Sequence, residues 1–192
     1  MRRIQQVALD LFDERGYRNV TVERVAAEAG VSPSSIYRYF GTKEMLVLYD
    51  EYDPQILELI RTSGGGVLTS PAELIRALCA AVPVFLDVII PDGYDRQIQQ
   101  RMEYVAAEPD IKAGLTRQTE EMERELRVIL SERIGGDPND LQVRLAAATG
   151  AWGFTATLFH WAESGYEQPL RTVLARAIDL LVRSVGALFE SD

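Results

Sequence analysis

The side chains best suited to specific chemistry are hydrogen-bonding residues just after position 32. The hydroxyls of Ser34 and Ser35 precede Arg38, the only long basic side chain of a short helical pattern that begins at Ser32-Pro33. Such groups bind phosphate oxygens and the base edges of DNA. A bidentate arginine contact to guanine contributes about 1–3 kcal/mol of discrimination between bases. The two serines and Arg38 therefore predict a surface that contacts DNA. On this surface, Arg38 binds either a guanine or only a phosphate.

Two short helices joined by a glycine turn must position these side chains. Residues 21–43 read TVERVAAEAGVSPSSIYRYFGTK, with apolar positions on one face of each helix. The spacing of Ala26, Gly30 and Ile36 is typical of a helix-turn-helix, because a small residue lets the helices approach and glycine accepts a positive φ at the turn. Thr21 and Ser32 are the expected N-caps. The helix N-terminus at Thr21 is also a candidate phosphate contact.

Helical periodicity continues along nearly the whole chain, without a convincing strand pattern. The other expected helices cover 4–15, 42–60, 71–90, 95–107, 110–134, 138–163 and 169–189. These patterns predict an all-α fold of about nine helices. A helix-turn-helix head over 1–50, with a linking helix to about 62, precedes a larger helical body over 67–192. Pro54 is expected to kink or split the linking helix, and Pro83 to bend a helix of the body.

The net charge of −9 is unevenly distributed along the chain. Residues 1–50 hold seven basic and seven acidic side chains, so the remaining 13 basic and 22 acidic side chains account for the whole net charge. Within 29–43 the only charged residues are Arg38 and Lys43. The acidic body therefore does not exclude DNA binding by the head, but the local positive field is modest.

Composition argues against several other classes of protein. Catalysis and metal binding have little support in the sequence. It has one histidine and one cysteine, no glycine-rich phosphate loop after a strand, and no cluster of residues with metal-ligand spacing. We therefore expect no enzyme activity, no cofactor and no metal. The chain has no apolar run of about 18 residues and no signal-peptide core at its start, which indicates a cytoplasmic protein without a membrane span. Cys79 lies in an apolar run and reads as a buried side chain rather than a reactive thiol.

Several linked motifs of the first 50 residues resemble the DNA-binding domain of the tetracycline-repressor-like (TetR) family of transcription regulators. They are ALDLFDERGYRNVTV, the pair Val25-Ala26 followed by Ala29-Gly30-Val31, and SSIYRYFGTKEML. The segments RMEYVAAEPDIKAG and EMERELRVILSERIGGDPNDL look like the subgroup whose body binds acyl-CoA-like ligands. Relatives often have a longer basic arm before the first helix, where this sequence has only Met1, Arg2 and Arg3.

The resemblance implies a DNA surface that extends beyond the serines and Arg38. It assigns phosphate contact or groove packing to Tyr37, Tyr39 and Lys43. Neighbours two apart on a helix differ by about 200° in direction, so one of the two tyrosines could instead pack inside the head. Phe40 is expected in the core. The candidate DNA-binding residues are Thr21, Ser34, Ser35, Tyr37, Arg38, Tyr39 and Lys43.

The resemblance also implies a homodimer through the last two helices and a small-molecule pocket in the body. Both helices are apolar around more than one face, so one face can pack internally while another meets a partner chain. Candidate pocket residues are Phe85, Ile89, Ile98, Arg101, Met102, Val105, Met122, Trp152 and Phe159; the alternative is plain core. Arg101 could bind an acidic ligand or pair with Asp95, Asp110 or a nearby glutamate. His160 reads as structural rather than as a ligand contact.

These features favour a ligand-responsive transcriptional regulator, most simply a homodimeric repressor that a small hydrophobic or acyl-CoA-like effector releases from its operator. Pro54 is a candidate hinge in the link between head and body. The alternatives are an activator, or a ligand-sensing dimer that acts through a protein partner. An enzyme is the interpretation that the sequence supports least.

Overall fold

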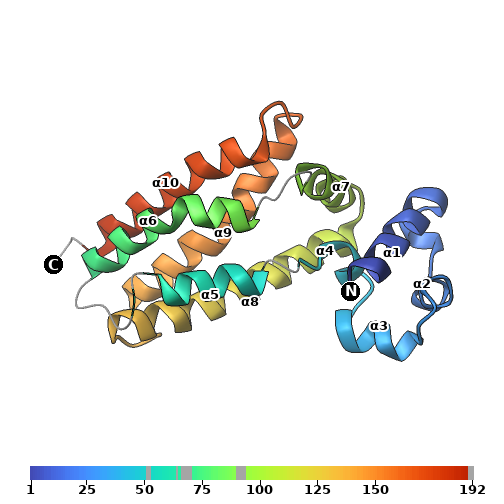
Figure 1. The fold of residues 1–192 in the computed structure, drawn as a ribbon, viewed down its shortest axis with the longest axis horizontal. Helices are drawn as coiled ribbons and strands as arrows, with labels where there is room; N and C mark the ends of the chain where they lie inside the picture. Colours follow the sequence, from blue (N-terminus) through green and yellow to red (C-terminus); the bar gives the residue numbers. More distant parts are fainter. Residues whose placement is uncertain (51–52, 64, 66–70, 90–93, 190–192) are drawn as a thin grey trace. The chain divides into compact units, whose positions relative to one another are not determined.

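The computed structural model describes residues 1–50, 53–63, 65, 71–89 and 94–189, with some side chains of the helices at 53, 71–89 and 188–189 left out. Every regular element in this part of the chain is a helix: ten α-helices and one 3₁₀ turn (Figure 1). The all-α prediction is confirmed. The chain divides into two compact units, one of Met1–Asp50 with Tyr104–Leu115 and the other of Glu51–Glu103 with Thr116–Asp192.

The first unit is a small helical bundle built around one apolar core. Its elements are α1 (Arg2–Arg15), η1 (Tyr17–Asn19), α2 (Val22–Ala29), α3 (Pro33–Phe40) and α4 (Met45–Leu48). α1 packs on α2 and α4, and α2 packs on α3. The expected apolar faces meet there, since Phe12, Val25, Ile36 and Leu46 are each at most 1% exposed. Phe40 is also buried, as its pattern predicts.

Side-chain caps fix where α2 and α3 begin. The Thr21 hydroxyl accepts a hydrogen bond from the Arg24 amide at 3.2 Å, and the Ser32 hydroxyl accepts one from the Ser35 amide at 3.2 Å. Pro33 stands in the first turn of α3, where its missing N–H has no intrahelical partner to lose. Both predicted caps are confirmed, and they set the N-terminal ends of the two helices that flank the turn.

Gly30 joins α2 to α3 in the left-handed region, at φ 69° and ψ 34°. A Cβ added there would meet nothing within 4 Å, so any cost of a side chain comes from the backbone rather than from a clash. We expect Gly30→Ala to lower the free energy of unfolding by about 1–2 kcal/mol. Gly30→Asn should cost less, because asparagine enters this region more readily. Urea denaturation of both variants tests this, and equal costs for the two would contradict it.

The expected linking helix over 42–60 is divided in two. α4 ends at Leu48, Tyr49 has a non-helical ψ of 125°, and α5 runs over Asp53–Thr62. Pro54 therefore lies in the first turn of α5, where proline is tolerated. This split raises the count from nine helices to ten. Of the glycine-rich segment 63–66, residues 64 and 66 lie outside the described part of the chain.

The second unit contains longer helices that pack in pairs. They are α5, α6 (Pro71–Ile89), α7 (Tyr94–Ala107), α8 (Pro109–Ile134), α9 (Leu141–Glu163) and α10 (Leu170–Phe189); the ends of α7 and α8 that meet near 108 belong to the first unit. α10 packs on α9 and α6, and α5 packs on α6. Gly153 lets α9 and α10 approach closely, because a Cβ there would clash with the Leu181 side chain. Pro83 lies within α6, and the bend expected there stays a prediction.

Polar contacts hold the ends and faces of these helices. The Thr119 and Thr155 hydroxyls are 2.9 Å apart between α8 and α9 in a buried position. Arg133 of α8 is 5% exposed and donates to the carbonyl oxygens of Ser63 and Gly65, just beyond the end of α5. None of the helices in the described part of the chain is both long and apolar enough to cross a membrane.

Candidate DNA-contacting surface and body cavity

Three serine hydroxyls form a cluster at the N-terminus of α3. Ser32 Oγ lies 2.9 Å from Ser34 Oγ and 2.9 Å from Ser35 Oγ. Ser34 is exposed and Ser35 is half-buried. The Ser32 oxygen therefore holds the two following hydroxyls at the helix N-terminus, the end of a recognition helix that approaches base edges in helix-turn-helix complexes.

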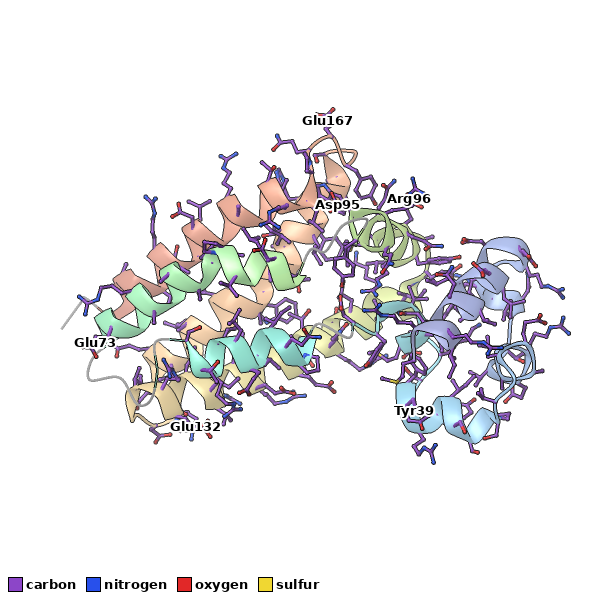
Figure 2. All side chains as sticks on the ribbon, viewed as in Figure 1. Tyr39, Glu73, Asp95, Arg96, Glu132 and Glu167 are labelled. Atoms are coloured by element: carbon purple, nitrogen blue, oxygen red, sulfur yellow. The ribbon has the colours of Figure 1, made fainter. Side chains whose placement is uncertain are left out.

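One turn further on, α3 presents an exposed group of two tyrosines and an arginine. Tyr37 and Tyr39 are each 49% exposed, so the alternative in which one of them packs inside is wrong. Figure 2 shows where Tyr39 lies on α3. Arg38 Nη2 donates to the Tyr39 hydroxyl at 3.0 Å, and its guanidinium carbon lies 4.7 Å from the centre of the Tyr39 ring. Tyr39 thus supports the arginine from one side. The exposed residues of α3 are Pro33, Ser34, Tyr37, Arg38 and Tyr39.

Lys43 differs from the other candidate DNA-binding residues because its amine is bound within the first unit. Its Nζ donates to the Tyr17 carbonyl oxygen at 2.5 Å and lies 4.0 Å from the Tyr17 ring centre and 5.6 Å from that of Phe12. Burial lowers the pKa of Lys43, opposed by the carboxylates of Glu108 and Asp110. The hydrogen bond from Lys43 to Tyr17 therefore stabilises η1. The phosphate contact of Lys43, like the DNA contacts of Thr21 and of the α3 side chains, stays a prediction.

The buried Tyr17 phenol is expected to make the stability of the first unit fall at alkaline pH. Burial, reinforced by the carboxylates of Glu44, Asp110 and Glu108, raises the pKa of the Tyr17 phenol to about 12 from 10.0. Because the fold favours the neutral phenol, this stabilisation is present below pH 10 and is lost as pH rises from about 10 to about 12. A shift of that size corresponds to at most about 2–3 kcal/mol.

We therefore expect wild-type stability to fall more steeply than that of Tyr17→Phe across this pH range. Urea denaturation of both proteins at several pH values measures the difference. Titration of Lys43 acts in the opposite direction, since a lowered lysine pKa favours the folded state as pH rises, and it is common to both proteins. Parallel pH profiles would contradict the prediction.

The segment Tyr104–Leu115 completes the first unit. The Tyr104 hydroxyl donates to Asp13 Oδ1, its ring packs edge-on to Phe12 at 6.2 Å, and Arg18 Nε pairs with Glu108 Oε2 at 2.8 Å. At Gly114 a Cβ would lie 2.8 Å from Glu44 Cγ, which indicates close packing of α8 on α4. Nothing in the spacing of the head motifs indicates this long-range contact.

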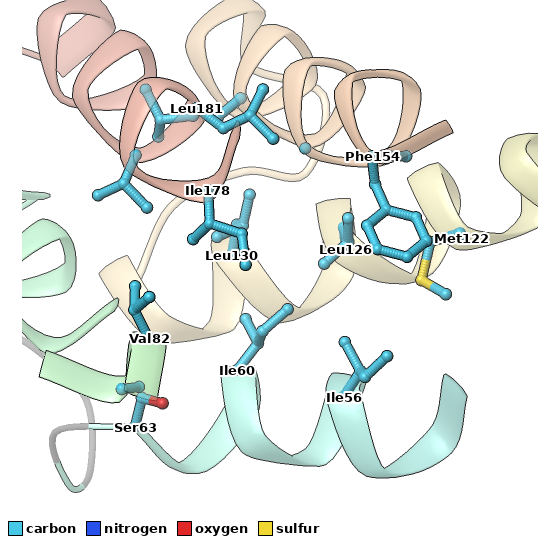
Figure 3. A pocket seen from close by; sticks show the side chains of 16 residues that line it. Ile56, Ile60, Ser63, Val82, Met122, Leu126, Leu130, Phe154, Ile178 and Leu181 are labelled. Carbon is cyan, nitrogen blue, oxygen red and sulfur yellow. The ribbon is translucent and has the colours of Figure 1, made fainter. Parts of the chain in front are cut away.

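The second unit contains an apolar cavity of about 160 Å³ that is partly open to solvent. Side chains of α5, α6, α8, α9 and α10 converge on it, with Phe154 beside Met122 and with Ile56 and Ile60 on one wall (Figure 3). The lining residues are Ile56, Ile60, Ser63, Ala81, Val82, Met122, Leu126, Leu130, Ala146, Gly150, Ala151, Phe154, Ile178, Leu181, Val182 and Val185. Ser63 supplies the only polar side chain among them, and none is charged.

Of the candidate pocket residues, Met122 lines this cavity. Ile98, Met102 and Val105 are buried on α7, and Arg101 is 9% exposed with its guanidinium 5.8 Å from the centre of the Tyr94 ring. Trp152 is 40% exposed and Phe159 half-buried, and neither lines the cavity. Phe85, Ile89 and also Cys79 belong to α6, but their side chains lie outside the described residues. The assignment of this set to a ligand site stays a prediction.

The remaining lining residues were missed for two reasons. α9 is apolar on all sides, so its periodicity does not distinguish Trp152 from Phe154, which point about 200° apart. The sequence pattern assigns Ile56, Ile60 and Ser63 to a linker and its boundary. Their i, i+4, i+7 spacing was the available signal, because it places them on one face of a helix.

A helix-turn-helix unit with an exposed polar second helix, in the same chain as a helical unit with an apolar cavity, is the arrangement of a DNA-binding regulator that senses a small molecule. Residues 4–49 match the family model for bacterial regulatory proteins of the tetR family, and residues 72–186 match the model for the MftR C-terminal domain. The second match alone spans more than half of the chain. The chain belongs to the TetR family of transcriptional regulators, which are not enzymes.

Curated relatives are transcriptional regulators as well. The chain is 32% identical over 139 residues to the HTH-type transcriptional regulator TcmR of Streptomyces glaucescens, covering 69% of this chain and 59% of TcmR. It is 35% identical over 107 residues to the HTH-type transcriptional repressor Rv3405c of Mycobacterium tuberculosis, covering 54% of this chain and 53% of that repressor. The chain thus spans between half and three-fifths of the length of these two curated relatives.

Among solved structures, a TetR-family regulator from Mesorhizobium loti superposes with a TM-score of 0.56 at 18% identity. The superposition covers 97% of this chain and 94% of that one. NalD, the secondary repressor of the MexAB-OprM multidrug efflux pump in Pseudomonas aeruginosa, gives 0.51 at 15% identity and covers 95% of this chain and 94% of its own. At these identities the likeness concerns the fold alone.

Proposed function

We propose that this protein is a homodimeric transcriptional repressor that a small apolar effector releases from its operator. The proposal keeps 1–50 as the DNA-binding head and 67–192 as the ligand-binding and dimerisation body. The observation that carries the ligand response is the apolar cavity in the second unit. Rv3405c, a relative, is described as a repressor, which supports the direction of control.

On DNA, α3 would enter the major groove. Recognition helices contact bases through their N-terminal residues, so Ser34 and Ser35 would lie next to base edges or phosphates. Arg38, held against Tyr39, extends further and can form two parallel hydrogen bonds to guanine. Because few cations support this surface, affinity requires two copies of α3 bound to one operator.

The dimer would form through exposed apolar side chains of the last two helices. Leu141, Leu145 and Trp152 follow one stripe of α9 and are 72%, 43% and 40% exposed, and Leu180 of α10 is 56% exposed. Burying such a stripe against its copy removes apolar surface from water on both chains. A two-fold dimer would also present two α3 helices to half-sites about 34–36 Å apart.

Trp152→Glu is therefore expected to make the protein monomeric at concentrations where the wild type is a dimer, since a carboxylate would be buried at the interface. Light scattering after size-exclusion chromatography measures the mass. Val84→Glu is the matched control, because Val84 is a similarly exposed apolar residue, at 52%, on α6. A Trp152→Glu protein that remains dimeric would remove this stripe from the interface.

The effector would act by binding better to a conformation whose heads do not fit the operator. A 100-fold release of DNA requires about 2.7 kcal/mol of difference in ligand binding between the two conformations. The complete chain should be tested by selection of bound duplexes from random or genomic DNA, followed by reporter transcription from the selected operator. Selection should yield two half-sites about one helical turn apart, and the reporter should be repressed.

Two results would overturn parts of this proposal. Failure to enrich any DNA sequence would remove operator binding. Activation of the reporter, or regulation only when a second protein is added, would favour the alternative of an activator or of a ligand-sensing dimer with a protein partner.

A further inference from the structure

The chemistry of the cavity wall restricts what it can hold. Fifteen of the sixteen described lining residues have hydrocarbon or thioether side chains or are glycine, and Ser63 is the exception. The Ser63 hydroxyl donates to the Leu59 carbonyl oxygen at 2.5 Å, so it offers a ligand its remaining acceptor capacity. Figure 3 shows this hydroxyl at one end of a wall that is otherwise carbon and sulfur.

No charged side chain is among the described lining residues of the cavity. Arg133 lies next to Ser63 without lining the cavity, and its two terminal nitrogens donate to the backbone carbonyl oxygens of Ser63 and Gly65. Arg61 of α5 pairs with Glu132 at 2.5 Å on the exposed side of the unit. A carboxylate or phosphate placed in the cavity would therefore lose its hydration without gaining a cation among the described lining residues, which is strongly unfavourable.

The volume sets a second limit. A cavity of about 160 Å³ is close to the size of apolar cavities that accept benzene, which corresponds to ligands of roughly six to nine non-hydrogen atoms. We infer that the cavity selects a small, uncharged, hydrocarbon-rich molecule with at most one hydroxyl, which would face Ser63. This inference rests on the proposed function, in which the cavity is the effector site. If the ligand is an acyl-CoA, only its acyl tail matches the apolar wall, and the coenzyme A group does not.

Ligands that share one alkyl chain test the inference on the complete protein. Calorimetric titration would compare 1-hexanol, hexanoate and hexanoyl-coenzyme A. We expect hexanol to bind at least about tenfold more tightly than hexanoate, because only hexanoate must bury a charge. Binding of hexanoate or hexanoyl-coenzyme A as tightly as hexanol, or more tightly, would overturn the inference.

Two neighbouring alanines of α6 provide a matched pair of variants. Ala81 lines the cavity, whereas Ala80 is exposed. Ala81→Leu should fill the cavity and lower the affinity for hexanol at least about tenfold, and Ala80→Leu should leave it unchanged. Equal affinities of the two variants would contradict the assignment of the binding site.

A variant that enlarges the cavity keeps the test independent of how Ala81→Leu folds. Phe154 lines the cavity and is only half-buried, so Phe154→Ala should remain folded and shift the preference from 1-hexanol towards 1-octanol. An unchanged chain-length preference would count against the site.

DNA release is measured separately with the selected operator. Hexanol that binds without releasing DNA would leave the ligand class intact and overturn the effector role. DNA release by hexanoyl-coenzyme A, with no hexanol binding, would preserve the proposed function and overturn the ligand class.

Discussion

Replacing Arg38 with alanine is expected to weaken operator binding by about 1–3 kcal/mol per protomer, or about 5- to 150-fold at each half-site. The exposed guanidinium is supported by the Tyr39 ring at 4.7 Å and by the Tyr39 hydroxyl at 3.0 Å, so little ordering is required when it binds. Because a dimer contains two copies, the combined loss on a palindromic operator would be about twice as large in free energy.

The pattern of the loss distinguishes base recognition from phosphate contact. If Arg38 binds a guanine, Arg38→Ala should also equalise affinities for operators that differ at one base position in each half-site. Fluorescence anisotropy with an operator substitution series, at fixed salt concentration, measures this. Arg38→Lys should restore the charge without the bidentate geometry, and therefore some affinity but little discrimination.

Arg96→Ala is the control, because it removes the same charge from an exposed position on α7 in the second unit (Figure 2). It should leave operator affinity nearly unchanged. A uniform loss across the whole operator series with Arg38→Ala would assign the residue to phosphate contact. No loss at all would remove α3 from the proposed interface at this position.

The largest expected effect on stability is that of Phe12→Ala, about 3–5 kcal/mol. Phe12 is 1% exposed, its ring packs edge-on against Tyr17 at 5.0 Å and Tyr104 at 6.2 Å, and the Lys43 amine lies 5.6 Å from its centre. Alanine would leave a cavity where α1, η1 and the segment Tyr104–Leu115 meet. A loss of this size is a large fraction of the stability of a small unit.

Urea denaturation and operator binding together test this prediction. The loss should fall mainly on the first unit, so DNA binding would fail under conditions in which hexanol still binds the second unit. Phe12→Leu should recover much of the stability because it preserves most of the volume. Tyr37→Ala, which truncates an aromatic residue that is 49% exposed, should change stability by less than about 0.5 kcal/mol. A Phe12→Ala cost below about 1 kcal/mol would show that the core collapses around the missing ring.

The local signals of the head were readable in the sequence. The caps at Thr21 and Ser32, the left-handed glycine at 30 and the buried face of Ile36 and Phe40 all depend on neighbours a few residues away. The same holds for the five long helices after residue 70, whose ends agree with the expected ranges to within about three residues. Short-range hydrogen bonds and helical periodicity determine such features, so the residue types suffice to predict them.

Tertiary packing decided the features that depend on distant parts of the chain. Lys43 binds the Tyr17 carbonyl oxygen across 26 positions, and Tyr104 reaches Asp13 across 91. The cavity lies where five helices leave unfilled volume, with Phe154 rather than Trp152 on its wall. The sequence alone determined the helices and the turn, because their causes are local. Only the tertiary structure decided which apolar faces close a core and which leave a cavity, since that depends on how side chains from separate helices fill the space between them.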